Sequence, residues 1–566
     1  MSDVSYSYDI FDTCLVRACG SPEMIWDILA NRILRNSSNT ADVNDFILIR
    51  RQAEGKAREL LINETKEDVT IGDIYNFCDF SSLTSISNQE IMKSEMEVEE
   101  DMLVPVFSIL QEIDKLHQAG ENITFISDMY LSKNFIKKIL INTGFFHDGD
   151  RLYISGEIGK SKSTGHLYDY VKKELNISFK QWIHKGDNKY SDYQIPKRKG
   201  IKTILINHSL SYYERKAIEF DLALAPSDLK KITHISRAVR LSMTDEPAYR
   251  FATDFIAPQM TTFVHNILED ARHRGIHHLY FMARDSYILY IIAEEFARLY
   301  PGISLHYLYA SRQSLYKPDE NCMSFLQQEG LTRSHSAIVD MVGSRRCQHC
   351  INKLFTQHGF DKIHAYYYEV TPYRLMSNDT YTAMYYQEKL AGSPYYHHAS
   401  HPLLEQYFGI TDQLRTIGYK KEFEKILPVY EPDLVDAQYK KKLFNINKKI
   451  CVAFAKHYIN AYIAEPFRSN NFFFAVFADF CHVPHRDYLS ALCGFFSTDS
   501  ANQQEPLLEK RNLFSIIFDK KHYLRWKNGN LVFNSGRLYR PIITTLRWYY
   551  IIKKKCLNRK HSTNCR

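Results

Sequence analysis

The sequence lacks several features that would place it in a class of protein at once. It has no run of about 18 apolar residues, so we expect no transmembrane helix. Its first residues lack the basic and apolar regions of a secretory signal. Its 11 cysteines follow no disulfide framework, and its one C-x-x-C pair, Cys347 and Cys350, has no second pair at zinc spacing. These absences favour a protein of the reducing cytoplasm.

Acidic residues are missing from the C-terminal stretch. Residues 520–566 hold thirteen lysines and arginines and no acid, which leaves 59 of the 72 basic residues to balance all 65 acidic ones. This mildly acidic body with a basic tail indicates a polyanionic partner. Apolar and basic residues are interleaved within 540–560, so we expect a short interfacial segment, not a clean amphipathic helix, that holds the protein peripherally on the anionic inner face of a membrane. A tail docked on the acidic body is the alternative, and nucleic acid is the less favoured partner.

The length and pattern of the chain predict several α/β domains. A chain of 566 residues exceeds what one core supports, roughly 250–300 residues. Short apolar runs that stop at small or polar residues alternate with helical stretches, and strands that alternate with helices predict a parallel sheet covered on both faces. Residues 21–118 have helical spacing. The apolar runs cover residues 4–9, 121–128, 151–156, 181–187 and 201–207.

Polar residues gather where these runs end. Because the carboxyl ends of parallel strands meet at one edge of a sheet, we expect these side chains to lie together. The residues at these ends are Asp9, Ser127 with Asp128, the loop up to Lys162, and Asp187. Each of them singly could cap a helix or pair with a neighbour. Ligands of such sheets bind beyond the carboxyl ends of the strands, so together these residues predict a ligand site at that edge.

In this order, the motifs resemble those of the haloacid dehalogenase-like (HAD) hydrolase superfamily across residues 1–207. The resemblance implies a Rossmann-like sheet with a helical cap inserted between the first and second motifs, and a phosphatase-like hydrolase that uses an aspartyl nucleophile. The catalytic residues that it implies are Asp9, Thr13, Ser127 and Lys162, with Lys160 as the competing choice for the lysine. A carboxylate nucleophile, a hydroxyl, a lysine and an acidic pair suit chemistry on a phosphate group. The cofactor that it implies is Mg²⁺, held by Asp9, the backbone carbonyl of Phe11, Asp187 and Asp192.

The sequence departs from that pattern at Phe11. In the phosphatases of the superfamily, an aspartate at this position protonates the leaving oxygen, and a general acid contributes about 10²–10⁴-fold. Three interpretations remain open: a substrate with a good leaving group, a proton from Asp12 or Asp128, or a site that binds phosphate without turnover. The retained pair of Asp187 and Asp192 favours a bound metal and a working hydrolase.

The second half repeats the alternation of strands and helices. Apolar runs within residues 275–296, 304–315, 336–355 and 363–370 again end in polar residues, so we expect a second α/β sheet. A Gly-Ser-Arg turn at a helix start can hold an anion through backbone amides, and arginine forks suit phosphate. The candidate anion site consists of Arg284, Asp285, Arg312, Gly343, Ser344 and Arg345. The alternative is that the acid and the serine cap helices while the arginines pair with surface acids.

The order of the two halves, with FMARDSY and LYASRQSL downstream, resembles large two-domain members of the superfamily found in bacterial surface-polysaccharide gene clusters. This resemblance extends to roughly residue 430 and implies a role in capsule or lipopolysaccharide biosynthesis, with a phosphorylated sugar or glycan precursor as partner. We expect a hydrolase domain at 1–215 with a cap at about 18–120, a second α/β domain at 216–505, and a basic tail at 506–566. The alternatives are a catalytically silent binding or scaffold protein, and a glycan-related transferase with its chemistry in the second domain.

Overall fold

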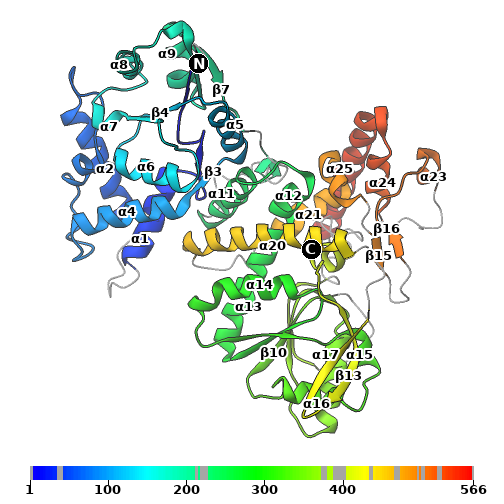
Figure 1. Cartoon of the computed structure of the whole chain (residues 1–566). Helices are drawn as coiled ribbons and strands as arrows, with labels where there is room; N and C mark the ends of the chain where they lie inside the picture. Colours follow the sequence, from blue (N-terminus) through cyan, green and yellow to red (C-terminus); the bar gives the residue numbers. More distant parts are fainter. Residues whose placement is uncertain are drawn as a thin grey trace. The chain divides into compact units, whose positions relative to one another are not determined.

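The chain folds into two compact units, each with one parallel β-sheet (Figure 1). Unit 1 holds residues 1–245 and 457–464, and unit 2 holds residues 246–456 and 465–566. The domain limits expected at residues 215 and 505 remain predictions, because compactness alone does not define a functional domain. The computed structural model describes residues 4–34, 43–208, 210, 214–216, 227–370, 379–386, 403–431, 437–463, 472–493, 496–498, 504–518 and 526–563.

The sheet of unit 1 is built from the five apolar runs near the N-terminus. Its strands are parallel and ordered β5-β4-β1-β6-β7, which confirms the expected α/β class. Tyr8, Phe125 and Trp182 are almost completely buried, since helices cover both faces of a parallel sheet. Tyr8 pairs with Phe125 of β4 and with Lys185 of β6, so these three strands end at the same edge. The strands are β1 (Ser5–Tyr8), β4 (Ile123–Ser127), β5 (Arg151–Ile154), β6 (Trp182–Gly186) and β7 (Lys202–Leu205).

A helical insertion separates β1 from β4. The antiparallel pair β2 (Leu15–Arg17) and β3 (Leu103–Pro105) bounds it. Within it, α1 contacts both α2 and α4 (Figure 1). Its helices are α1 (Pro22–Leu34), α2 (Val43–Leu61), α3 (Ile71–Tyr75) and α4 (Asn88–Met102). The other helices of unit 1 include α5 (Phe107–Gln118), which packs against β4, and then α6 (Lys133–Asn142), α7 (Ser155–Ile158), α8 (His166–Leu175), the π-helix η2 (Lys189–Gln194), α9 (Ile195–Arg198) and α11 (Ser227–Leu241).

Buried charge pairs hold the insertion together. The guanidinium of Arg50, which is fully buried, donates to both carboxylate oxygens of Glu95 at 2.8 Å. The hydroxyl of Tyr75 donates to the same carboxylate at 2.6 Å. Arg17 of β2 makes a similar forked contact with Glu99 of α4 at 2.9–3.1 Å. Paired and hydrogen-bonded in this way, the charges tolerate burial, whereas loss of one partner typically costs about 3–5 kcal/mol.

The sheet of unit 2 is also parallel and is ordered β12-β11-β10-β8-β9. The four apolar runs of the second half form four of its strands, and β12 adds an edge strand that the pattern did not predict. Tyr280, Val339 and Tyr367 are fully buried in it. The strands are β8 (His278–Met282), β9 (Ser304–Leu308), β10 (Ser336–Gly343), β11 (His364–Val370) and β12 (Tyr381–Tyr386).

Helices and two small hairpins complete the second half of the chain (Figure 1). The hairpins are β13 (Arg415–Glu422) with β14 (Lys425–Glu431), and β15 (Phe496–Thr498) with β16 (Gln504–Pro506). The main helices are α12 (Pro247–Phe251), α13 (Ala257–Arg274), α14 (Tyr287–Phe296), α15 (Arg312–Tyr316), α16 (Cys322–Gln328), α17 (Arg346–Gln357), the π-helix η5 (Leu403–Phe408), α20 (Ala437–Asn460), α21 (Phe472–His482), α22 (Arg486–Leu489), α23 (Leu513–Ile517), α24 (Lys527–Phe533) and α25 (Tyr539–Thr563).

The basic C-terminal stretch is folded onto unit 2. Trp526 is fully buried, and its Nε1 donates to the carbonyl of Cys481 at 2.8 Å. The hydroxyl of Tyr550 bonds the carboxylate of Asp479 in α21. Residues 540–560, expected as a short interfacial segment, lie within the single helix α25. None of the helices that the structure describes has the length and apolar character needed to cross a membrane.

Candidate active site

Asp9 stands at the carboxyl end of β1, with β4 and β6 on either side. It is 4% exposed, and its N–H donates to the carbonyl of Lys185 at 2.8 Å, which fixes the turn out of the strand. Ser127 is the last residue of β4, and Asp187 directly follows β6. The structure therefore brings Asp9, Ser127 and Asp187 to one edge of the sheet.

Lys162 connects two of the carboxylates at this edge. Its Nζ donates to Oδ1 of Asp9 at 2.5 Å and to Oδ1 of Asp192 at 2.6 Å, and its side chain is 3% exposed. Nζ of Lys160, the competing choice, lies 3.5 Å from Oε1 of Glu67, and the Lys160 side chain is more exposed than that of Lys162. Of the two lysines, Lys162 is thus the one that reaches Asp9, and its ammonium offsets part of the negative charge.

The charges at this edge strongly affect one another. Burial raises the pKa of Asp9 well above its usual range, although Lys162 opposes the shift. Burial also disfavours the charged form of Lys162, yet Asp192 and Asp9 hold its pKa well above the usual value. Burial opposes ionisation of Asp192 too, but Lys162 holds the pKa of that carboxyl below its ordinary value. Burial, Asp12 and Asp192 together raise the pKa of Asp187 to about 6. These carboxylates outnumber the single ammonium among them.

A chain of buried polar groups supports Asp192 from inside the sheet. His184 of β6 contacts Oδ1 of Asp192 through Nε2 at 3.2 Å and Oγ of Ser7 through Nδ1 at 2.7 Å. Trp182 Nε1 donates to the same serine oxygen at 2.7 Å, and burial lowers the pKa of His184. Ser7 and His184 were not among the candidate residues. Their signal in the sequence is a polar residue inside an apolar strand, where each needs a hydrogen-bond partner.

Two further contacts position Asp9 and Lys162. Thr13 donates to Oδ2 of Asp9 at 3.3 Å, the oxygen that Lys162 does not contact. Asp128 accepts a hydrogen bond from the backbone N–H of Lys162 at 2.7 Å, and burial raises the pKa of Asp128. Asp128 therefore anchors the loop that carries the lysine.

Phe11 and Asp12 form the turn that follows Asp9. The guanidinium of Arg17 lies 4.7 Å from the centre of the Phe11 ring. Asp12 has a left-handed φ of 56°, which residues other than glycine adopt rarely. This path brings the Asp12 carboxylate near enough to Asp187 to raise the pKa of Asp187. Of the two alternative acids, Asp12 thus lies beside the acidic cluster, whereas Asp128 bonds the lysine loop.

The carboxylate cluster has the donor set of a site for a hard divalent cation. One oxygen each of Asp9, Asp187 and Asp192 lies within 4.8 Å of the other two. Mg²⁺ prefers oxygen ligands and keeps several waters or substrate oxygens in its shell. Burial raises the pKa of Asp187, as do the charges of Asp12 and Asp192, and a cation here would offset those charges. The three side chains therefore fit Mg²⁺, and the Phe11 carbonyl stays a predicted ligand.

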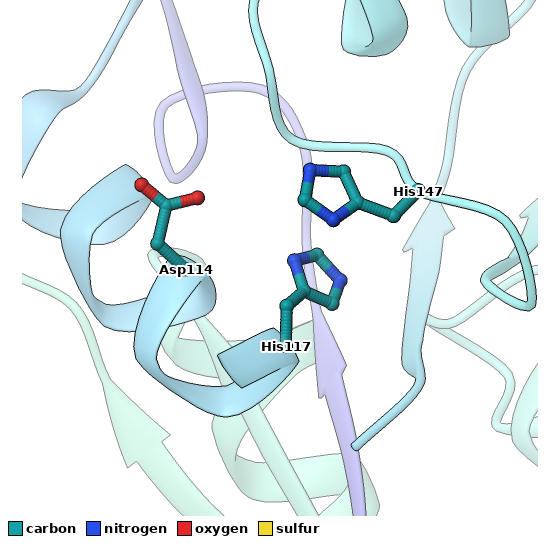
Figure 2. Close-up of side chains that lie close together, drawn as sticks. All are labelled: Asp114, His117 and His147. Carbon is teal, nitrogen blue, oxygen red and sulfur yellow. The ribbon is translucent and has the colours of Figure 1, made fainter. Parts of the chain in front are cut away.

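A second cluster of metal-binding side chains lies elsewhere in unit 1 (Figure 2). Asp114 and His117 come from α5 and His147 from the loop before β5, and one ligand atom of each lies within 4.8 Å of the others. The two imidazole rings stack with their centroids 4.0 Å apart. His117 Nε2 contacts Asp150, which also accepts from the backbone N–H of Ile123 at the start of β4. This cluster therefore lies at the opposite edge of the sheet from Asp9.

The structure places the candidate residues of unit 2 around two cavities that follow the strands. A cavity of about 580 Å³ is lined by Arg284, Asp285 and Arg312. A smaller cavity of about 150 Å³ shares Arg312 with it and is also lined by Gly343, Ser344 and Arg345. Sequence reasoning missed further charged residues that line the larger cavity, namely Lys317, Asp340, Arg346, Glu405 and Arg415. Asp340 is hidden in the apolar run of β10, and the last two come from segments whose return to this edge no local pattern indicates.

Comparisons with known proteins find distant similarity to solved structures. No family model and no curated protein matches this chain. Among solved structures, the chain is similar to the HAD-hydrolase YfnB from Bacillus subtilis bound to magnesium, at 16% identity, TM-score 0.27, and coverage of 36% of this chain and 88% of that one. It is similar to a HAD phosphatase from Thermococcus onnurineus, at 14% identity, TM-score 0.27, and coverage of 36% and 86%. It is also similar to a HAD family enzyme from Bacteroides thetaiotaomicron, at 12% identity, TM-score 0.27, and coverage of 38% and 98%. Identities and TM-scores this low do not establish a shared activity.

Proposed function

We propose that unit 1 is a Mg²⁺-dependent hydrolase of the HAD type, which removes a phosphoryl group through a covalent step at Asp9. The observation that carries the proposal is the double contact of Lys162 Nζ, 2.5 Å from Asp9 and 2.6 Å from Asp192. A structural ion pair needs only one carboxylate. A buried lysine shared by two, with Asp187 beside them at the strand ends, is a preassembled set of charges suited to a phosphate group.

In the proposed reaction, an oxygen of Asp9 attacks phosphorus and the bond to the leaving oxygen breaks. Water then hydrolyses the aspartyl phosphate and releases inorganic phosphate. Lys162 stabilises the charge on the phosphoryl oxygens, and Thr13 orients the Asp9 carboxylate through its second oxygen. Ser127, buried at the end of β4, would donate to a phosphoryl oxygen. Bound Mg²⁺ would reduce the repulsion between the carboxylates and the phosphate.

Phe11 favours substrates with a good leaving group, such as a phosphoanhydride or an anomeric sugar phosphate. An apolar ring under the guanidinium of Arg17 supplies no proton to a leaving alkoxide. For substrates that need one, Asp12 is the donor that we propose, because its carboxylate lies beside the acidic cluster. The proposed substrates are phosphorylated sugars or glycan precursors of capsule or lipopolysaccharide biosynthesis, in the cytoplasm near the inner membrane face.

A test of this function measures phosphate release from a panel of sugar 1-phosphates and nucleotide sugars, with Mg²⁺ and with EDTA. We expect turnover with Mg²⁺ only, and a loss of at least about 10³-fold in Asp9→Asn, which keeps the shape of the side chain but removes the nucleophile. Asp169→Asn is the matched control, because Asp169 is an exposed carboxylate paired with Lys199 in the same unit. Turnover that persists in Asp9→Asn would contradict the covalent mechanism.

The second candidate function is a binding protein whose first unit no longer turns over, and Phe11 is the observation that favours it. In that case calorimetry would detect Mg²⁺-dependent phosphate binding in the wild type, while no substrate of the panel would release phosphate. Phosphate release and calorimetric binding, measured on the same preparation, therefore distinguish a hydrolase from a silent binding protein.

A further inference from the structure

The strand ends of unit 2 surround a cavity that the proposed hydrolase reaction does not use. It has a volume of about 580 Å³, within the range of roughly 300–1,000 Å³ typical of small-molecule sites. Residues that follow β8, β9 and β10 line it, among them Arg284, Arg312 and Arg346. The carboxyl ends of parallel strands are where α/β sheets bind their ligands. Position and size therefore both indicate a binding site.

Basic side chains outnumber acidic ones around this cavity. Five basic residues line it against Asp285, Asp340 and Glu405. Arg312 forms an ion pair with Glu405 of η5. The guanidinium of Arg346 lies over the Tyr316 ring, 4.2 Å from its centre. With every group ionised the formal balance is two positive charges, which matches a phosphate dianion. Planar guanidinium forks hold phosphate oxygens in pairs, which ammonium groups cannot do.

Two carboxyl groups line the same cavity and give it a second kind of contact. Burial raises the pKa of Asp285, although Arg312 opposes the shift. Burial and the neighbouring Asp285 raise the pKa of Asp340 to about 7. Asp340 uses Oδ1 to accept from the backbone N–H of Met341 at 2.9 Å. A carboxyl group accepts hydrogen bonds when it is ionised and can also donate one when it is protonated, and a ligand hydroxyl group is a suitable partner for either form.

The N-terminus of α17 adds backbone donors to the phosphate side. The smaller cavity of about 150 Å³ is lined by the turn Gly343-Ser344-Arg345 and by the first residues of this 12-residue helix. No side chain caps the helix at Arg345. The first N–H groups of a helix carry partial positive charge and favour an anion. This end of the helix shares Arg312, Asp340 and Arg346 with the larger cavity.

We propose that this cavity is a second ligand site, which binds a phosphorylated polyol such as a sugar phosphate. Arg312, Arg346 and the start of α17 hold the phosphate, and Asp285 and Asp340 hold hydroxyl groups. An inorganic anion would satisfy only the basic groups, whereas a neutral sugar would leave their positive charge unmatched. The proposal is independent of turnover at Asp9, because it concerns a different sheet and different residues.

The test is calorimetric titration of the full-length Asp9→Asn protein in EDTA, which removes the metal from unit 1. The probes are a panel of hexose 1- and 6-phosphates, with inorganic phosphate, glucose and UDP-glucose as the comparison arms. We expect at least one hexose phosphate to bind at least about tenfold more tightly than inorganic phosphate, with no detectable binding of glucose. UDP-glucose binding more tightly than every hexose phosphate would assign the sugar to a nucleotide-linked form.

Variants then locate the binding. Arg312→Lys and Arg346→Lys keep the charge but lose the fork, and each should weaken hexose phosphate binding at least about fivefold. Asp340→Asn should reduce the preference for hexose phosphate over inorganic phosphate. Arg272→Lys is the matched control, because Arg272 is an exposed residue of the same unit paired with Glu269. Equal unfolding temperatures would show that each variant is folded.

Three outcomes would overturn the proposal. One is the absence of binding by every phosphorylated probe. Another is equal affinity for inorganic phosphate and for all hexose phosphates, which would show that the site does not recognise the polyol part of the ligand. The third is unchanged binding in both arginine variants, which would place the phosphate outside this cavity.

Discussion

The two sheets share one architecture but carry opposite charge at the edge where their strands end. In unit 1 the carboxylates of Asp9, Asp187 and Asp192 lie together, and the ammonium group of Lys162 contacts two of them, Asp9 and Asp192. In unit 2 the cavity is lined by five basic residues and three acidic ones. A parallel sheet fixes where a ligand binds but leaves its charge to the residues that end the strands. From this comparison we propose that the edge in unit 1 requires a cation before it can accept a phosphate, whereas the edge in unit 2 accepts an anion directly.

Lys162→Met should have the largest effect, because it leaves buried carboxylates without their cation. We expect a loss of about 3–5 kcal/mol in the free energy of unfolding of unit 1 in EDTA. Mg²⁺ should restore part of that loss, since the ion supplies the missing positive charge. Thermal unfolding followed by circular dichroism, with and without Mg²⁺, measures both effects.

Two controls accompany this measurement. Lys160→Met removes a partly exposed lysine that pairs with Glu67, and it should cost less than about 1 kcal/mol. His147→Ala disables the second cluster at the opposite edge, so any Mg²⁺ effect that it abolishes belongs to that cluster (Figure 2). Equal losses in Lys162→Met and Lys160→Met would contradict the central place of Lys162.

Phe11→Asp would test the role of residue 11 in unit 1, because it adds the acid that the turn lacks. The new carboxyl group would stand beside Arg17, whose guanidinium now lies 4.7 Å from the Phe11 ring. We expect hydrolysis of simple alkyl phosphates to rise by about 10²-fold, with little change for anomeric sugar phosphates. Steady-state rates on both substrate types measure the difference, and Phe11→Leu controls for loss of the ring. Equal wild-type rates on the two types would show that another acid, such as Asp12, already acts.

The sheet edges could be predicted from the sequence because strand ends are local signals. An apolar run that stops at Asp9, Ser127 or Asp187 marks both a strand and its edge, and parallel pairing then brings the ends together. The site residues that could not be predicted reach the site from segments that are far away in the sequence. Glu405 and Arg415 line the cavity of unit 2 although they follow its central strands by many residues, and no local period indicates their return.

The C-terminal helix shows a second limit of sequence reasoning. The apolar residues of 540–560 cover more than one face, which argued against a helix with a single apolar side. The structure explains this pattern by two different surroundings. Tyr550 packs on α21, where its ring stacks on His482, whereas Trp548 and Ile552 are 63% and 55% exposed. A periodicity test that assumes one buried face cannot distinguish these two roles.

A pH titration would test whether ionisation of Asp340 weakens anion binding in the cavity of unit 2. Because the pKa of Asp340 is raised to about 7, this group is neutral at lower pH and gains a negative charge as the pH rises through 7. Sulfate keeps a constant charge over this range, so we expect its affinity to fall by about tenfold between pH 6 and pH 8. The charged and titratable groups that face the carboxyl are Asp285, Arg312, Cys347 and Tyr367. Asp340→Asn should flatten the profile, and an unchanged slope in that variant would assign the effect to another group.

The smallest expected effect concerns the basic C-terminal helix, whose exposed residues we propose to bind an anionic membrane surface. Trp548, Tyr549, Ile551 and Ile552 are exposed next to Lys553. Basic residues near an anionic leaflet contribute about 1 kcal/mol each, and exposed aromatic side chains insert at the headgroup level.

Removal of the whole segment would not test this proposal, because Trp526 and Tyr550 are buried in unit 2 and a truncation before them would disturb its fold. Point variants avoid the problem. Lys553→Glu and Trp548→Ser should each reduce cosedimentation with vesicles of 30 mol% phosphatidylserine by a few fold, and high salt should reduce wild-type binding as it screens the charges. Phe423→Ser is the matched control, since Phe423 is an almost fully exposed apolar residue of unit 2 in the hairpin of β13 and β14. Equal binding by the wild type and both helix variants, or equal binding to vesicles of phosphatidylcholine alone, would show that the helix does not hold the protein on an anionic surface.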